Sequence, residues 1–277
     1  MRPVVSPRPA RSRAETPNPA SASAESAYTA PALEKGLDIL ELLAGEADGL
    51  SQAAIAQRLS RSTAELFRML SVLERRGYVT RHDGGYRLSL RLFELAHQHP
   101  PLKRLLSVAL PAMQELAQQS RQSAHLVIHF SRRILVVAQV DSPEPMGFSV
   151  RLGANFPFRP DRASSRVLSA FQPAAMQEEL IAELLANGSR GLSAAGVRAE
   201  LAEIVRAGIY VAPSDTASGV TDLCAPVFDH SEGAVAALTV PYLKQRDVKV
   251  SLAASRQALL ATVRRISAGL GAPARAP

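Results

Sequence analysis

Arg68 is the residue whose type and position most directly suggest chemistry with a partner. It lies in the stretch "SRSTAELFRMLSVLERRGYV", residues 60–79. A planar guanidinium can donate two parallel hydrogen bonds to one guanine. Nearby, Ser62, Thr63 and the backbone N–H groups of a helix's first turn can bind phosphate. These residue types at these positions are typical of a helix that enters the major groove of DNA.

A capping box and an apolar stripe predict the helix that would position Arg68. Ser62 is placed to cap the helix and Glu65 lies three residues later, as a capping box requires. Glu65 keeps two open roles, because its carboxylate could serve the cap alone or could accept a hydrogen bond from a cytosine amine. The predicted core stripe consists of Leu66, Met69, Leu70 and Leu73, which leaves Ala64, Arg68, Ser71 and Arg75 on the opposite face.

The surrounding elements predict a winged helix-turn-helix domain over residues 31–95. Apolar spacing predicts helices over 32–44 and 52–59, before the helix that carries Arg68. Residues 78–89, "YVTRHDGGYRLS", contain two β-rich runs around an Asp-Gly-Gly turn, which is a strong hairpin signal. Arg81 and Arg87 flank the tip of this hairpin, where a wing would contact the DNA backbone or minor groove.

The charge distribution supports the same surface. The chain has a formal net charge of +7, which favours an anionic partner, nucleic acid before membrane surface. Residues 31–57 hold five acids and one base, whereas residues 58–95 hold eight arginines and four acids. We therefore expect the basic half to face DNA. Two alternatives stay open: the arginines could be ordinary solvated surface, or the winged domain could bind protein.

Two segments are predicted to lie outside the compact domains. Residues 1–30 are rich in Pro, Ser and Ala and nearly lack large apolar side chains, so we expect a disordered tail. This tail could be a dispensable extension or could add weak phosphate contacts. Helical periodicity resumes after residue 90 but is interrupted by Pro100-Pro101, which cannot lie inside a helix. A linker over residues 96–107, with a linker helix, is therefore predicted.

Residues 108–272 are predicted to form a second domain of α+β class. Strands joined by hairpins, with helices grouped between and after them, indicate a mainly antiparallel sheet flanked by helices. The predicted strands cover residues 124–130, 133–141, 147–153, 221–229 and 233–243. The predicted helices cover residues 109–120, 173–186, 194–207 and 248–268.

Few residues of this second domain suggest catalysis. Cys224 is the only cysteine, which excludes an internal disulfide and a cysteine-based zinc cluster. It lies in an apolar strand, where a buried thiol is usual, and a catalytic thiolate would need a nearby base. His125 and His129 share one strand face, where packing or pocket-lining roles are expected rather than metal ligation.

Other functional classes lack their sequence signals. Gly-x-Ser-x-Gly, the phosphate loop and the dinucleotide fingerprint are absent from the sequence, so we expect no cofactor, no metal and no enzyme. No apolar run is long enough for a membrane span, and the N-terminus lacks a signal peptide's apolar core. A cytoplasmic protein without a membrane partner is the resulting expectation.

A family resemblance covers nearly the whole chain. The segment "ALEKGLDILELLAGEADGLSQAAIAQRLSRSTAELFRMLSVLERRGYVTRHDGGYRLSLRLFELA" closely resembles the winged helix-turn-helix of IclR-type transcriptional regulators. In the second half, "VRLGANFPF", "ASSRVLSA" and "GVTDLCAPVFDHSEGAVAALTV" are similar to that family's GAF-like effector-binding domain. The resemblance implies a homodimer or homotetramer on palindromic double-stranded operator DNA, with a small-molecule effector that changes DNA affinity.

The resemblance also assigns residues. With the motif reading above, the predicted DNA-binding residues are Ser62, Thr63, Glu65, Phe67, Arg68, Arg75, Arg81 and Arg87. The predicted effector-binding residues are Ala163, Ser164, Ser165, Asp222, Cys224, Thr239 and Pro241, together with His125. The sequence departs from the family where Ser165-Arg166 replaces a frequent Gly-Lys and where Pro241 replaces a small polar residue. Positive charge near the presumed pocket comes from Arg151, Arg159, Arg162 and Arg166, which favours an organic acid.

The resulting expectation is a ligand-responsive transcription factor that controls a catabolic operon. Its operator affinity would depend on a small organic effector, because effector occupancy would shift the balance between arrangements of two reading heads. The competing expectation is an enzyme with a Cys224-based site in the second domain. That alternative requires a partly exposed Cys224 with a histidine in reach.

Overall fold

The computed structural model describes residues 30–188, 191–245 and 249–273 of the chain. It divides into two compact units, with the boundary between Ala96 and His97. Residues 1–29 of the predicted tail lie outside the described residues. Within the described residues, no helix is long and apolar enough to cross a membrane.

The first unit has three helices and a small sheet, as the sequence predicts. Its core is formed by apolar side chains from all three helices, among them the fully buried Ile39, Ile55 and Leu66. Three antiparallel strands pair in the order β1-β3-β2. The elements are α1 (Pro31–Ala44), β1 (Leu50–Ser51), α2 (Gln52–Arg58), α3 (Thr63–Arg75), β2 (Val79–His82) and β3 (Gly85–Leu88).

The predicted hairpin is confirmed at its turn. His82 pairs with Gly85, so Asp83 and Gly84 form a two-residue loop between β2 and β3. Both loop residues have positive φ, 49° at Asp83 and 77° at Gly84. Two positive φ values are what a hairpin turn of the I′ type requires, which is why an Asp-Gly pair suits this tip.

The two prolines lie at a helix start. After α4 (Arg91–Gln98), helix α5 runs from Pro100 to Ser120, so both prolines occupy its first turn, where the missing N–H costs nothing. Residues 100–107, which the sequence places in a linker, are thus helical and belong to the second unit. There, Leu105 packs into the core.

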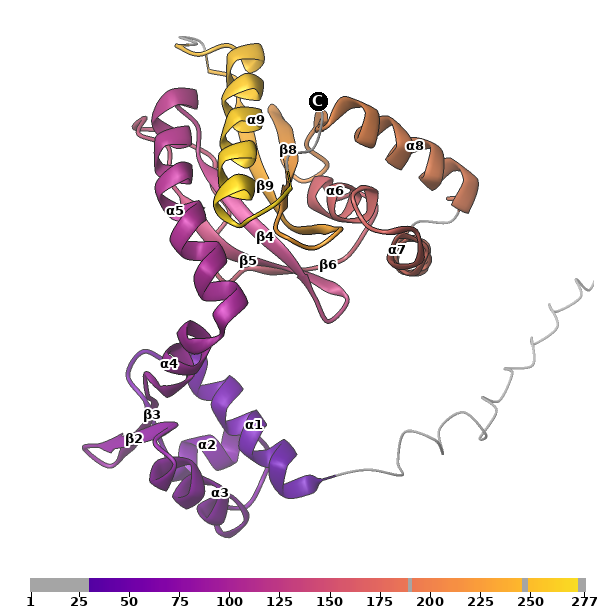
Figure 1. Cartoon of the computed structure of the whole chain (residues 1–277). Helices are drawn as coiled ribbons and strands as arrows, with labels where there is room; N and C mark the ends of the chain where they lie inside the picture. Colours follow the sequence, from indigo (N-terminus) through magenta and orange to yellow (C-terminus); the bar gives the residue numbers. More distant parts are fainter. Residues whose placement is uncertain (1–29, 189–190, 246–248, 274–277) are drawn as a thin grey trace, which may run out of the picture. The chain divides into compact units, whose positions relative to one another are not determined.

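The second unit is built around a six-stranded antiparallel sheet (Figure 1). Its strand order is β6-β5-β4-β9-β8-β7, with every described neighbour pair antiparallel, as expected for an α+β domain. The strands are β4 (Ala124–Phe130), β5 (Arg133–Val140), β6 (Asn155–Pro157), β7 (Tyr210–Pro213), β8 (Val220–Phe228) and β9 (Ala234–Leu243).

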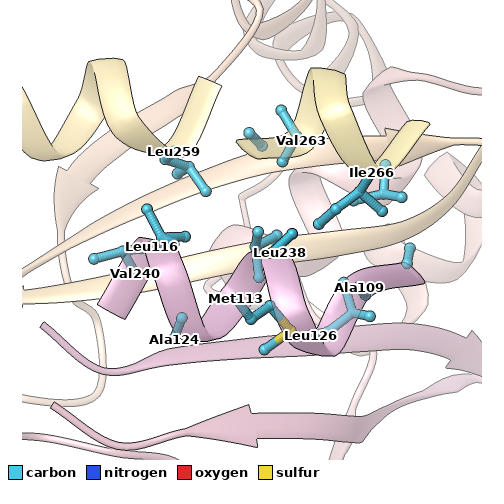
Figure 2. Packing of buried hydrophobic residues seen from close by; sticks show 14 of the residues in the cluster. Ala109, Met113, Leu116, Ala124, Leu126, Leu238, Val240, Leu259, Val263 and Ile266 are labelled. Carbon is cyan, nitrogen blue, oxygen red and sulfur yellow. The ribbon is translucent and has the colours of Figure 1, made fainter. Parts of the chain in front are cut away.

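Helices cover both faces of this sheet. Helices α5 and α9 (Leu252–Gly269) pack on one face, where Met113 and Leu116 meet Leu238 and Val263 (Figure 2). The other face is covered by α6 (Ala163–Ala170), α7 (Ala174–Asn187) and α8 (Ala194–Ala207) (Figure 1). Successive residues of a strand therefore pack into the cores on opposite faces of the sheet, because side chains alternate across a sheet.

Three differences from the sequence predictions concern this unit. The strand predicted over residues 147–153 is wrong: this segment is irregular, and the strand that pairs with β5 begins at Asn155. The reason is local, because Gly153 turns the chain at φ 78° and its N–H donates to the Val136 carbonyl at 2.9 Å. Strands β6 and β7 are too short to show alternation in the sequence. Helix α9 begins at Leu252 rather than at 248, since Ser251 caps it, and residues 246–248 are outside the described residues.

Candidate functional site

Helix α3 begins with the predicted capping box. The Ser62 hydroxyl accepts from the Glu65 N–H at 3.3 Å, and the Glu65 carboxylate accepts from the Ser62 N–H at 3.5 Å. The same carboxylate lies 2.5 Å from the Lys35 ammonium of α1. Hydrogen bonds from Lys35 first, and from the Ser62 backbone second, hold the pKa of Glu65 below its ordinary value. These contacts favour the capping role of Glu65 over the base-reading role.

The opposite face of α3 is exposed. Leu66 and Leu70 are fully buried, which fixes the rotation of the helix about its axis. Ala64, Arg68, Ser71 and Arg75 are exposed as predicted, and so are Thr63 and Phe67. Among the described residues, Arg68 and Arg75 have no ion-pair or hydrogen-bond partner, whereas Arg58 and Arg61 are engaged by carboxylates. The cations that remain available therefore lie on the outward face.

The two wing arginines are held differently. The Arg87 Nε donates to the Asp48 carbonyl at 3.1 Å, which ties β3 to the turn before β1. Arg81 is exposed, and its guanidinium lies 5.5 Å from the centre of the Tyr86 ring. This arrangement leaves Arg81 as the better placed of the two to meet an anion.

The second unit contains a cavity of about 420 Å³ beside α6 and the sheet. Strand register brings predicted effector residues together, because His125 pairs with Thr239 and Asp222 pairs with Pro241. Six of the eight predicted residues line this cavity, namely His125, Ala163, Ser164, Asp222, Thr239 and Pro241. Ser165 and Cys224 do not line it.

Cys224 lies beneath the cavity wall and cannot serve as a nucleophile. It is fully buried, and burial raises the pKa of its thiol to about 12. The Thr239 hydroxyl donates to its sulfur at 3.2 Å, and Thr239 itself lies 3.4 Å from the Ser164 hydroxyl. A thiolate therefore does not form near neutral pH, which removes the basis of the enzyme alternative.

Much of the cavity wall is apolar and was not identified from the sequence. The segment between β5 and β6 contributes Phe148, Ser149, Val150, Arg151 and Ala154, and β6 contributes Phe156. Val127, Ile134 and Val136 provide the apolar sheet floor. Only the alternation of Phe148 and Val150 could have indicated this wall. That alternation predicted a strand instead.

Three residues that line the cavity each carry a buried polar atom without a partner among the described residues. The buried atoms concerned are Nδ1 of His125, Oδ1 of Asp161 and Nε of Arg162. Burial lowers the pKa of His125 to about 4, so this imidazole is neutral at pH 7. Arg162 occupies the N-cap position of α6, where no side chain caps the helix, and its guanidinium lies 4.7 Å from the centre of the Phe156 ring. Uncapped N–H groups and a guanidinium together suit an anion.

Of the four arginines expected near the pocket, two line the cavity and two do not. Arg151 and Arg162 line the cavity. Arg159 does not, and it pairs with Asp161 at 3.1 Å. Arg166 also points elsewhere, toward Glu200 at 2.9 Å and Asp215 at 3.7 Å.

The second histidine of β4 has a packing role. His129 lies edge-on to Phe158, with ring centres 4.6 Å apart, and does not line the cavity. In the part of the chain that the structure describes, no group of three or more His, Cys, Asp or Glu residues could hold a metal ion.

Curated relatives match this chain over most of their length. The glycerol operon regulatory protein of Streptomyces coelicolor is 29% identical over 211 residues, which cover 75% of this chain and 83% of that protein. The transcriptional regulator XynR of Escherichia coli is 25% identical, over 87% of this chain and 98% of its own length. These relatives are transcriptional regulators, and this chain is likewise a regulator rather than an enzyme.

Solved structures share the fold. An IclR homologue from Microbacterium hydrocarbonoxydans, complexed with 4-hydroxybenzoate, has a TM-score of 0.69 at 22% identity over 86% of this chain and 98% of its own. Pseudomonas aeruginosa HmgR has a TM-score of 0.68 at 24% identity over 87% and 100%. Two family models match, the IclR helix-turn-helix domain at residues 32–83 and the bacterial transcriptional regulator IclR C-terminal domain at residues 102–268. This chain, with its DNA-binding and effector domains, therefore belongs to the IclR family of transcriptional regulators.

Proposed function

We propose that this regulator controls a catabolic operon and that a small organic acid, bound in the cavity beside α6, changes its affinity for operator DNA. The observation that supports an acid as the effector is a set of groups in the cavity that suits an anion. This set consists of the uncapped first turn of α6, the unpartnered Nε of Arg162 and the nearby Arg151. The apolar floor adds room for a hydrocarbon body.

Helix α3 is the proposed DNA-reading element. Its exposed face presents Thr63, Phe67 and Arg68 at the N-terminal half, which is the part of a recognition helix that meets base edges. Ser62 and Arg75 would add phosphate contacts, and Arg81 and Arg87 would serve the wing. Such a protein works in the cytoplasm, where bacterial operator DNA lies.

A second copy of the chain is the proposed partner for the first unit's apolar surface. Leu33 and Leu37 on α1 are 63% and 48% exposed, and Leu90 before α4 is 80% exposed. Exposed leucines of this kind are typical of an interface. A homodimer or homotetramer would then set the spacing of two operator half-sites.

The test is a pair of titrations on the full chain. Fluorescence anisotropy with promoter DNA of the neighbouring operon should show specific binding that weakens steeply with salt, because phosphate contacts release counterions. Adding a metabolite acid that raises the melting temperature should shift the operator affinity. Binding that is equally strong on random DNA would contradict the regulator's proposed operator.

A further inference from the structure

We propose that effector binding is linked to proton uptake at Asp222: an organic monocarboxylate with an apolar body enters the cavity together with one solvent proton, which the Asp222 carboxyl then holds. This inference rests on the proposed acid effector and deepens it. The proton forms one O–H bond on Asp222, and this O–H donates to an oxygen of the ligand carboxylate. No other bond is made or broken.

The ligand's carboxylate is expected at the start of α6. The N–H groups of the first turn of α6 have no side-chain cap, and Nε of Arg162 has no partner among the described residues. An independent observation is His125, which is 8% exposed, lines the same cavity and has an unpartnered Nδ1. His125, Arg162 and the first residues of α6 line one cavity, so an anionic head fits there.

Asp222 lines the same cavity as these groups. The Arg162 guanidinium acts electrostatically on its carboxyl. A bound carboxylate beside Arg162 therefore lies within range of a second carboxylate. Two carboxyl groups that share a buried site cannot both ionise easily, so the pair holds a proton.

The surroundings of Asp222 already disfavour its charge. Burial first, and then the charge of Asp215, raise the pKa of Asp222, whereas the Ser214 hydroxyl and Arg162 lower it. On the neighbouring strands, Asp222 pairs with Pro241 and Ala212, neither of which carries a charge. Other titratable groups near it are Tyr210 on β7, Cys224 on its own strand and, around the cavity, His125, Asp161 and Arg151.

Asp222 is a better proton holder than the other acid of the cavity. Asp161 already has a cationic partner, because its Oδ2 lies 3.1 Å from Arg159. His125 is neutral in the ligand-free cavity, because burial lowers its pKa to about 4. The arginines stay charged throughout the working range of pH.

The sign of the pH effect follows from this linkage. Where free Asp222 is ionised and bound Asp222 is protonated, each binding event consumes a proton, so affinity falls as pH rises. The limiting slope is about tenfold per pH unit for one proton. Below the pKa of free Asp222 the slope vanishes, because both states then hold the proton.

The test uses benzoate as the probe and the full-length protein. Calorimetric titration near pH 7 in phosphate and in Tris, two buffers with different ionisation enthalpies, should give an uptake close to one proton per site. Affinity should fall as pH rises between the pKa of free Asp222 and that of bound Asp222, with a limiting slope of about tenfold per pH unit. This measurement needs no variant, so it stands whether or not a substitution disturbs folding.

Two matched variants assign the proton. Asp222→Asn mimics the neutral acid, so it should bind benzoate without proton uptake and without the pH slope. Asp161→Asn should retain both. Benzoate binding with no uptake, or an uptake lost in Asp161→Asn and kept in Asp222→Asn, would overturn this inference and leave the acid effector standing. If benzoate, phenylacetate and acetate all fail to bind, the acid effector and this inference both fall.

Discussion

The first turns of α3 and α6 differ in whether a side chain satisfies the backbone N–H groups that have no partner inside the helix. In α3, Ser62 and Glu65 satisfy the orphan N–H groups, and the turn is exposed. In α6, Arg162 stands at the N-cap, and the turn faces a cavity without a side-chain cap. The capped turn keeps fewer backbone donors for a ligand than the uncapped turn does.

This difference matches the two kinds of anion that we propose for the two units. DNA is a long polyanion, which exposed cations such as Arg68 can contact at many points, though salt screens each contact. A small acid offers a single charge, so it needs buried donors in a site with less water. We infer that charge acts at the surface of the first unit and inside the second.

The largest expected effect concerns the buried histidine of the second unit. The folded-state pKa of His125 is lowered from 6.5 to about 4, so the unfolded chain binds this proton first as pH falls. Stability is therefore complete above about pH 6.5 and is lost as pH falls toward about pH 4, by an amount on the order of 3 kcal/mol. Calorimetric unfolding at several pH values measures it.

The variant His125→Gln removes this titration and should flatten the acid slope of the second unit's transition. Glu65 in the first unit gives a smaller effect at lower pH. Its pKa is lowered, so its contribution is present above the unfolded pKa and is lost as pH falls through the folded one. An unchanged slope in His125→Gln would show that another group carries the acid sensitivity.

The next largest effect concerns Arg68 on the exposed face of α3. Arg68→Ala should weaken specific operator binding by roughly 1 to 3 kcal/mol at one base position, because a bidentate contact to a guanine is lost. Anisotropy titrations against operators with single base changes measure this loss. Arg68→Lys is the matched control, since it keeps the charge but loses the planar fork. An equal loss on random DNA would make Arg68 a phosphate contact only.

The smallest effects are expected from substitutions at the N-cap residues of α6 and α3. Arg162→Ser would give α6 a side-chain cap like that of α3, and we expect a gain of about 0.5 to 1 kcal/mol in stability with a loss of acid affinity. Ser62→Ala should do the reverse in α3, costing about 0.5 to 2 kcal/mol of stability. Chemical denaturation and benzoate titration report both. Unchanged benzoate affinity in Arg162→Ser would separate Arg162 from the ligand.

Local signals in the sequence were sufficient for the first unit. The Ser62–Glu65 spacing predicted a capping box and the Asp83-Gly84 turn predicted a hairpin, and both formed as expected. Each depends on residues within a few positions of one another. The exposed position of Arg68 followed from the apolar stripe alone, because a helix with one buried face must present the other.

The effector cavity depended on longer-range structure. Most of its predicted residues came from the family resemblance. Four of them, His125, Asp222, Thr239 and Pro241, meet because β8, β9 and β4 align in register, whereas Ala163 and Ser164 come from the start of α6. The apolar wall from residues 148–156 was missed, because a short apolar alternation predicts a strand equally well. Only packing showed that Ser165 and Cys224 are buried beside the cavity rather than in its wall.

The sequence by itself determined helices α1 to α3, α7 and α8, the hairpin, the α+β class and the basic face of α3, since these depend on periodicity, caps and local charge. Tertiary structure alone decided which polar atoms lack partners. Asp222 and Arg162 are 60 residues apart in the chain, and their electrostatic coupling in one cavity arises from the packing of α6 against the sheet. No local sequence pattern predicts that a buried polar atom lacks a hydrogen-bond partner, because this depends on all the residues that pack around the atom.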